Sequence, residues 1–193
     1  MSSPLILASS SPYRKALLER LGLPFVAVSP DCDERPRAGE DPIQLAERLA
    51  TTKARALTAK YTHHLIIGSD QVAALGAELL GKPGTPERAF AQLRRQSGQT
   101  VLFHTAVAVL DSASGRQQVL TDTTRVVFRD LDDDEIRNYL SREQPWDCAG
   151  SFKVEGLGIA LFERVETLDP TALMGLPLIA LAGLLGEFGV RVI

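Results

Sequence analysis

Short apolar runs alternate, in the first half of the chain, with segments whose apolar residues repeat at helical spacing. The runs at 4–8, 25–28 and 65–67 predict short strands, and the last is continuously apolar, as expected of a strand buried on both faces. Between them, the apolar positions of 12–21 and 42–61 fall on one helical face, and each segment opens on a proline that favours the first helical turn. This alternation predicts an α/β fold.

The second half of the chain adds hairpins to this pattern. Alternating positions at 101–110 and 117–128, joined by DSASG, predict a long hairpin, and 72–75 with 78–80 predict a short one. The other predicted elements are helices that begin near Pro86 and Asp132, a strand at 159–165 and a helix at 178–188. Because no internal repeat or evident linker interrupts the pattern, we expect a single domain over residues 1–193 with a mixed sheet.

Composition narrows the class of partner. The net charge is −3, whereas surfaces that bind nucleic-acid polymers are usually basic. Cys32 and Cys148 lack the close spacing of a zinc motif. The longest uncharged run, 171–186, is shorter than the roughly 20 residues of a membrane span and contains Pro177, and the N-terminal segment lacks the basic start of a signal peptide. We therefore expect a cytoplasmic protein with no membrane and no nucleic-acid polymer as partner.

Polar side chains with phosphate and metal chemistry follow the predicted strands. Ser9 and Arg14 come after the first strand, Glu34 after the second and Asp70 after the third. Because ligands of open α/β sheets gather at the ends of strands, these side chains are expected to meet in one cleft. Hydroxyls and cations suit phosphate oxygens, and Mg²⁺ takes one or two carboxylates and completes its shell with water and phosphate. The set favours a polyphosphate ligand, with Glu34 and Asp70 as candidate metal ligands.

Lys53 and Lys82 are further cations that could neutralise phosphate charge. Each candidate also has an ordinary structural interpretation. Lys53 lies beside the apolar face of its predicted helix and could be an exposed helix residue. Ser9 could belong to a helix cap, Glu34 could be a solvated loop charge and Asp70 could form an Asx-turn. Lys82, between Gly81 and Pro83, carries more weight, because no predicted helix or strand explains it.

An ordered set of short motifs supplies a more specific signal. The motifs are LILASSSPYRKALLERLG, the Asp33–Glu34 loop, RLATTKA, IIGSDQV, GKP, CAGSFKVEGLGI and LMGLPL. They occur in the order seen in the Maf family, which the chain resembles from end to end. The resemblance implies a nucleoside triphosphate pyrophosphatase that cleaves between the α and β phosphates and needs a divalent metal, Mg²⁺, Mn²⁺ or Co²⁺. It also implies a fold similar to that of inosine triphosphatase, an elongated mixed β-sheet flanked by helices with a central cleft.

The resemblance also implies roles for the candidate residues. Asp70 matches the family's essential aspartate, the proton acceptor in hydrolysis. The residues that match phosphate-binding positions are Ser9, Arg14, Lys53 and Lys82. Glu34 matches the family's loop glutamate, and with Asp70 it is the candidate metal ligand.

Three further positions concern the base of the nucleotide. Tyr13, Gln71 and Glu155 together resemble the YceF-type subfamily, whose preferred substrate is 7-methyl-GTP. The methylated guanine ring carries positive charge, so Tyr13 could stack on it in a cation–π contact of about 1–2 kcal/mol. Glu155 could accept hydrogen bonds from the base edge and offset the positive charge.

Two other functions stay open from the sequence alone. A dTTP/UTP preference is the first, although members of that type carry Gln where Glu155 stands here. The second is a nucleotide-binding regulator of cell division that does not turn its ligand over. A homodimer is also open, since Leu176–Leu185 could lie in a core or at a subunit contact.

Overall fold

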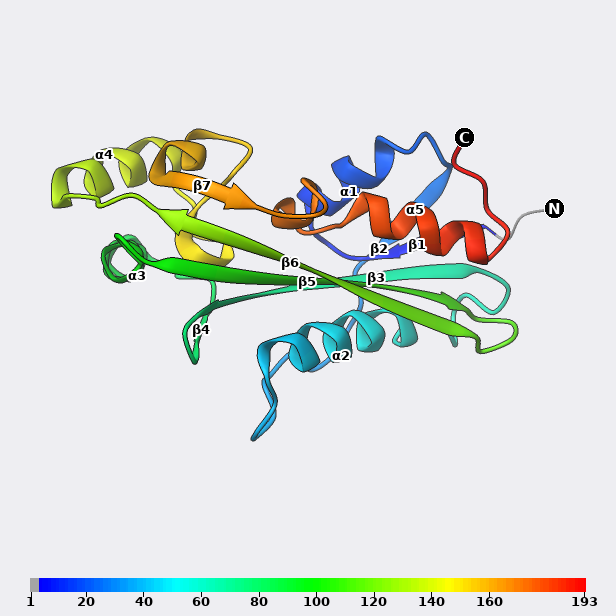
Figure 1. The fold of residues 1–193 in the computed structure, drawn as a ribbon. Helices are drawn as coiled ribbons and strands as arrows, with labels where there is room; N and C mark the ends of the chain where they lie inside the picture. The colour runs from blue at the N-terminus through cyan, green and yellow to red at the C-terminus, as the bar shows by residue number, and fades with distance from the viewer. Residues whose placement is uncertain (1–3) are drawn as a thin grey trace. The chain divides into compact units, whose positions relative to one another are not determined.

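The computed structural model describes residues 4–193, and its helices flank a mixed sheet (Figure 1). The described strands follow the order β2-β1-β3-β5-β6-β7, and β4 pairs with β3. The strands are β1 (Leu5–Ala8), β2 (Phe25–Val28), β3 (Leu65–Leu75), β4 (Glu78–Leu80), β5 (Thr100–Asp111), β6 (Gln117–Phe128) and β7 (Phe162–Glu166). The helices are α1 (Pro12–Glu19), α2 (Pro42–Arg55), α3 (Pro86–Gln96), α4 (Asp133–Glu143) and α5 (Leu178–Glu187), with 3₁₀ turns η1 (Ala149–Ser151), η2 (Leu157–Leu161) and η3 (Ala172–Met174). The predicted mixed α/β sheet is confirmed, while the central cleft stays a prediction.

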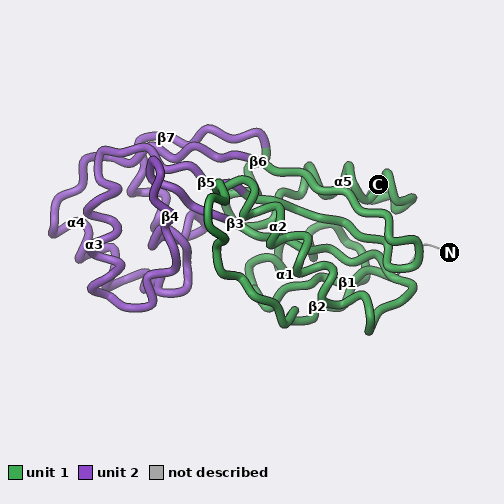
Figure 2. Tube along the Cα trace, turned by 90° about the horizontal axis from the view of Figure 1, so that it is seen from below, with its two compact units in different colours: residues 1–71, 105–122, 169–193 green, residues 72–104, 123–168 purple. Residues whose placement is uncertain are grey.

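The chain divides into two compact units, which Figure 2 colours separately. Unit 1 contains the residues up to Gln71, together with Thr105–Asp122 and Asp169–Ile193, and unit 2 contains Val72–His104 and Thr123–Leu168. Strands β3, β5 and β6 each contribute residues to both units. The single domain expected from the sequence stays a prediction.

Strand β1 lies between two parallel neighbours at the centre of unit 1, and its alternate residues face opposite ways. It pairs with β2 on one side and with β3 on the other. Leu5 and Leu7 pack in a core cluster with residues of α1 and α5, whereas Ile6 and Ala8 pack with residues of α2. Figure 1 accordingly shows α2 on one face of these strands and α1 with α5 on the other. The double coverage explains why β1 and the first residues of β3 are continuously apolar.

Strand β3 is longer than the sequence predicts. An end at Ile67 and a separate strand at 72–75 were expected, with Asp70 in the connection between them. Instead β3 runs unbroken from Leu65 to Leu75, and Asp70 lies inside it. The short hairpin is confirmed, because the end of β3 pairs antiparallel with β4.

Tertiary contacts keep the Gly-Ser sequence extended where local propensity favours a turn. Gly68 pairs with Ala8 of β1. The Ser69 hydroxyl lies 2.8 Å from the carbonyl oxygen of Ala106 and 2.9 Å from that of Gly175, so its hydrogen bonding is satisfied by distant segments rather than by a local turn. Asp70 therefore belongs to a rigid strand and not to a loop.

Two other boundaries differ from the prediction. Helix α2 ends at Arg55 rather than near residue 61, because the chain continues in a series of turns. The strand expected at 159–165 begins only at Phe162, after the 3₁₀ turn η2. That turn contains Gly158, whose amide donates to the carbonyl oxygen of Lys153 at 3.0 Å and so closes a tight bend.

Local signals placed the helix starts correctly. Asp41 caps α2, where its side chain accepts from the Gln44 amide and the Gln44 side chain accepts from the Asp41 amide. Asp132 and Glu135 form the same capping box at α4, which begins where the sequence predicted a helix start. Each box satisfies backbone donors that the first helical turn leaves unpaired.

Unit 2 is built around α3, α4 and a cluster of phenylalanines. Phe152 meets Phe103, Phe128 and Phe162 edge to face, with ring centroids 4.8–5.9 Å apart. Such contacts fix the segment that leads into the Gly-rich residues 153–158. Among the helices of residues 4–193, none combines the length and apolarity that crossing a bilayer requires.

Replacement of Gly68 by alanine tests how closely α2 approaches β3. An added Cβ would overlap the Ala50 carbonyl oxygen and would lie 2.9 Å from the Ala54 nitrogen, both backbone atoms of α2. We expect Gly68→Ala to lower the free energy of unfolding in urea by about 1–3 kcal/mol or more, as overpacking does. Gly183→Ala in α5 is the control, since an added Cβ meets nothing within 4 Å there. Equal stability of Gly68→Ala and wild type would contradict the close approach.

Candidate active site

A lysine ammonium group shared by two carboxylates is the most distinctive charged feature of unit 1. Lys53 Nζ lies 2.5 Å from Asp70 Oδ1 and 2.9 Å from Glu34 Oε2. Lys53 and Asp70 are 5% and 6% exposed, whereas the Glu34 side chain is 55% exposed. The cluster is therefore buried on the Asp70 side and open to solvent on the Glu34 side.

The packing of α2 against β3 brings Lys53 and Asp70 together. Lys53 lies in the last turn of α2, on the buried face that also carries Leu49 and Ala50. Gly68 lets the backbone of α2 come close to β3 two residues before Asp70. The exposed-helix alternative for Lys53 and the Asx-turn alternative for Asp70 are both wrong, because Lys53 is buried and Asp70 is in a strand.

Arg14 supplies a second cation near the same carboxylates. Its Nε donates to the Gly175 carbonyl oxygen at 2.8 Å, the oxygen that also accepts from Ser69. Burial lowers the pKa of the Arg14 guanidinium below its ordinary value, and the nearby Asp70 and Glu34 oppose that shift. The Gly175 carbonyl thus holds Arg14 in the field of the two acids.

Ser9 and Ser11 accept different backbone hydrogen bonds at the start of α1. Ser11 is the cap of α1, and its Oγ accepts from the Arg14 amide at 3.4 Å. Ser9 is buried just after β1, and its Oγ accepts from the Ser11 amide at 3.1 Å. Ser9 therefore orders the turn that leads to Arg14, and its role toward phosphate stays a prediction.

Gln71 follows Asp70, and its amide group contacts β5 and the 3₁₀ turn η3, which comes after β7. Its Nε2 lies 3.0 Å from Thr105 Oγ1 and from the Ala172 carbonyl oxygen, and 3.1 Å from that of Leu173. With the amide hydrogens used inside unit 1, Oε1 is the atom of Gln71 left for a ligand. Tyr13 is half-buried in the first turn of α1, directly before Arg14.

Lys82 and Glu155 belong to unit 2, whereas the other candidate residues belong to unit 1. Lys82 is exposed between β4 and α3, and Glu155 is exposed in the Gly-rich segment. Glu143 at the end of α4 anchors that segment: its Oε2 accepts from the Leu157 amide at 2.7 Å, and its carbonyl oxygen accepts from Lys153 Nζ at 3.2 Å. Glu155 is thus carried by a segment fixed at both ends.

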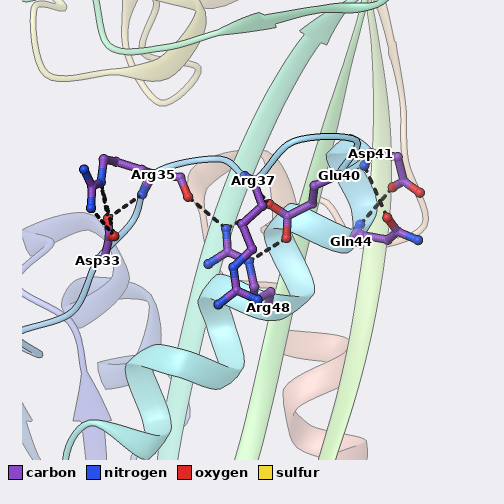
Figure 3. A network of polar contacts seen from close by, with 7 residues as sticks. All are labelled: Asp33, Arg35, Arg37, Glu40, Asp41, Gln44 and Arg48. Carbon is purple, nitrogen blue, oxygen red and sulfur yellow. Dashed lines mark hydrogen bonds and ion pairs between the residues drawn. The ribbon is translucent and has the colours of Figure 1, made fainter.

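The irregular loop that carries Glu34 is tied to α2 by polar contacts, drawn in Figure 3. Arg48 binds Glu40, and Arg35 binds Asp33. A cavity of about 280 Å³ lies between loop and helix, lined by Asp33, Arg35, Pro36, Arg37 and Arg48. No sequence pattern indicated a role for Arg48 or Glu40, because the many charges between residues 31 and 48 allow several pairings.

The donor set is compatible with a divalent cation that arrives with a phosphate ligand. Within residues 4–193, no three histidine, cysteine or acidic side chains are grouped to hold a metal by themselves. Glu34 and Asp70 both reach Lys53 Nζ, so two carboxylates stand close together. Mg²⁺ needs only one or two carboxylates when water and phosphate supply the other ligands. The two acids therefore fit such an ion.

Comparison with known proteins identifies the family. The profile of the Maf-like protein family matches residues 4–188. The chain belongs to the Maf family. The family resemblance noted in the sequence motifs is thereby confirmed, and the match covers residues of both units.

Relatives of this Maf protein share more than half of its residues. A protein of Polaromonas sp. (strain JS666) is 58% identical over 98% of this chain and 86% of its own length, and one of Pseudomonas aeruginosa is 56% identical over 97% and 98%. Both are named 7-methyl-GTP pyrophosphatase, as is a relative from Nitrosococcus oceani at 53% identity over 98% and 95%. Among solved structures, a HAM1 protein from Coxiella burnetii is similar with a TM-score of 0.49 and 18% identity, over 66% of this chain and 73% of that one.

Removal of the Lys53 ammonium group tests whether Asp70 depends on it. We expect Lys53→Met to lower the free energy of unfolding by about 3–5 kcal/mol, because a buried carboxylate is left uncompensated. The double variant Lys53→Met/Asp70→Asn should recover most of that loss in urea unfolding. Lys15→Met is the control, since the Lys15–Glu19 pair is more than half exposed and should change stability by less than about 1 kcal/mol. A Lys53→Met protein as stable as wild type would contradict the pairing.

Proposed function

We propose that this Maf protein hydrolyses 7-methyl-GTP to 7-methyl-GMP and diphosphate, and so removes a modified nucleotide from the nucleotide pool. Family membership and the names of relatives at 53–58% identity support a nucleoside triphosphate pyrophosphatase. The observation that carries the proposal is the Lys53 ammonium group held between Asp70 and Glu34. A cytoplasmic location and dependence on a divalent metal belong to the same proposal.

In the proposed reaction, a water oxygen attacks the α phosphorus and the bond from that phosphorus to the β-phosphate oxygen breaks. Asp70 takes the proton of the water. Its Oδ1 is engaged with Lys53, so Oδ2 is the oxygen available to the water. Because β3 and the lysine hold this carboxylate in place, little reorganisation is needed when the proton moves.

The cations stabilise the negative charge that builds on the diphosphate leaving group. An ammonium group has three N–H donors. Asp70 and Glu34 engage Lys53, and a remaining donor can point to a phosphate oxygen. Arg14 adds its guanidinium group from α1, and Ser9 and Lys82 are assigned to the phosphates on the family pattern. A divalent cation held by Glu34 and Asp70 would supply further charge neutralisation on the triphosphate.

The residues assigned to the base suit a positively charged purine. Tyr13 offers an aromatic ring for stacking. Gln71 offers its Oε1 acceptor, since its Nε2 is used by Thr105 and Ala172. Glu155 offers a carboxylate that accepts from the base edge and offsets the ring charge. Together they provide a stacking surface, a neutral acceptor and a negatively charged acceptor, which match a positively charged base that donates hydrogen bonds.

A substrate panel tests the proposed function. Wild-type protein is assayed with 7-methyl-GTP, GTP, dTTP and UTP, with Mg²⁺ or Mn²⁺, and diphosphate release is measured. We expect kcat/KM to be highest for 7-methyl-GTP, and Asp70→Asn to bind nucleotide but lose about 10²–10⁴-fold in turnover, the range for a general base. Binding of 7-methyl-GTP without diphosphate release would favour the regulator, and a preference for dTTP or UTP would favour the other enzyme type.

Replacement of Glu155 by glutamine tests the recognition of the charged ring. Gln keeps hydrogen-bonding capacity and removes the negative charge, so the ratio of kcat/KM for 7-methyl-GTP over GTP should fall by roughly tenfold, in line with 1–2 kcal/mol for a charged contact. Glu163→Gln is a matched control, because Glu163 is an exposed acid of unit 2 paired with Arg164 on β7. An unchanged ratio in Glu155→Gln would exclude the carboxylate from base selection.

A further inference from the structure

Glu34 reaches Lys53 from a loop without regular secondary structure. Residues 29–41 between β2 and α2 contain no helix or strand. The Glu34 side chain is 55% exposed, and its ion-pair partner among residues 4–193 is Lys53. One contact from an exposed side chain does not fix a loop, because its net worth in water is small. Another interaction has to place the loop.

Arg48 provides that interaction from α2, five residues before Lys53. Its Nε lies 2.5 Å from Glu40 Oε1, and its Nη2 lies 2.8 Å from Glu40 Oε2. The same Nη2 donates to the Arg35 carbonyl oxygen at 3.0 Å. Figure 3 shows the guanidinium group of Arg48 between these two points of the loop. Arg48 therefore holds the peptide next to Glu34 and the far end of the loop together.

The Arg48–Glu40 pair is shielded, in contrast to the ion pairs of residues 4–193 that do not involve Lys53. Its side chains are 17% and 10% exposed. Apart from the pairs of Lys53, the remaining ion pairs have both side chains at least 40% exposed. A two-point contact between a guanidinium fork and a carboxylate is also geometrically specific, which a lysine cannot reproduce.

Two further contacts stiffen the loop on the Glu40 side. Glu40 Oε2 accepts from the Arg37 amide at 3.0 Å, and Asp41 then caps α2. The hydrogen bond from Arg48 lowers the pKa of Glu40 to about 2, so the carboxylate stays charged at neutral pH. Glu40 therefore binds Arg48 as a carboxylate at neutral pH.

We propose that Arg48 is a positioning residue that holds Glu34 against Lys53. The inference rests on the proposed function, in which the Lys53, Asp70 and Glu34 cluster receives the triphosphate. Arg48 itself is directed at Glu40 and the Arg35 carbonyl oxygen, so it acts through the loop. Loss of the anchor frees Glu34 and leaves the ammonium group of Lys53 with Asp70 alone.

A double-mutant cycle between Arg48 and Glu34 tests this inference. Arg48→Met should lower kcat/KM for 7-methyl-GTP by roughly 10–100-fold in the wild-type background, as removal of a supporting contact does. In the Glu34→Ala background, Arg48→Met should lower kcat/KM by less than about threefold, because the residue that Arg48 positions is absent. Arg48→Lys should not regain the kcat/KM that Arg48→Met loses. Glu40→Gln should also lower kcat/KM, by a smaller factor than Arg48→Met. If Arg48→Met does not fold, Glu40→Gln replaces it in the cycle.

The control is Arg55→Met on the same helix, where an exposed arginine donates to Gln117 Oε1. It should leave kcat/KM unchanged. Equal losses from Arg48→Met in both backgrounds would overturn the inference and would indicate direct contact of Arg48 with substrate. No loss in either background would overturn it too. A wild-type protein inactive on every nucleotide of the panel would instead refute the proposed function, so the two failures are distinguishable.

Discussion

The buried ion pair between Lys53 and Asp70 is the interaction on which the candidate site depends. Removing both charges from water is costly, and attraction within the pair offsets this cost only when the geometry is good. That geometry, 2.5 Å between Nζ and Oδ1, requires α2 to lie close against β3. Gly68 permits the close approach, and the parallel pairing of β1 with β3 sets the level at which Asp70 emerges beyond the end of β1. Two hydrophobic side chains of similar volume would stabilise the fold equally well, so the charges of Lys53 and Asp70 are better explained by ligand binding.

The charge of the cluster is balanced before any ligand is bound. Arg14 and Lys53 stand against Glu34 and Asp70, with one acid exposed and the other enclosed. A triphosphate brings several negative charges, and in the proposed function a divalent cation held by the two acids would offset part of them. The Glu34 side chain is open to an arriving ligand, whereas Asp70 is enclosed. One cluster thus combines a solvent-exposed acid with an enclosed one, and the enclosed acid is the one to which the proposed function gives the proton transfer.

Local signals in the sequence predicted most of the fold, and long-range contacts account for what was missed. The capping boxes of α2 and α4 and the apolar runs of β1 and β2 depend on neighbouring residues, so the sequence pattern sufficed. The course of β3 through Gly68 and Ser69 depends on Ala106 and Gly175, which lie far away in the chain. The meeting of Glu34 and Asp70 was expected from their positions after predicted strands, and in unit 1 both contact Lys53. The sequence did not reveal the pairing of Arg48 with Glu40, because the many charged residues between 31 and 48 allow several pairings.

A common design links the two exposed carboxylates of the proposal. Glu34 and Glu155 both lie on irregular segments, which allow a side chain to reach a ligand but provide no rigidity. In each unit a side chain at a neighbouring helix supplies the rigidity, Arg48 of α2 for the first segment and Glu143 of α4 for the second. Both anchors bind backbone atoms within two residues of the acid they support, the Arg35 carbonyl oxygen and the Leu157 amide. Contacts to the backbone restrict a segment whatever its side chains do, so each support fixes its segment without occupying the carboxylate that faces the ligand.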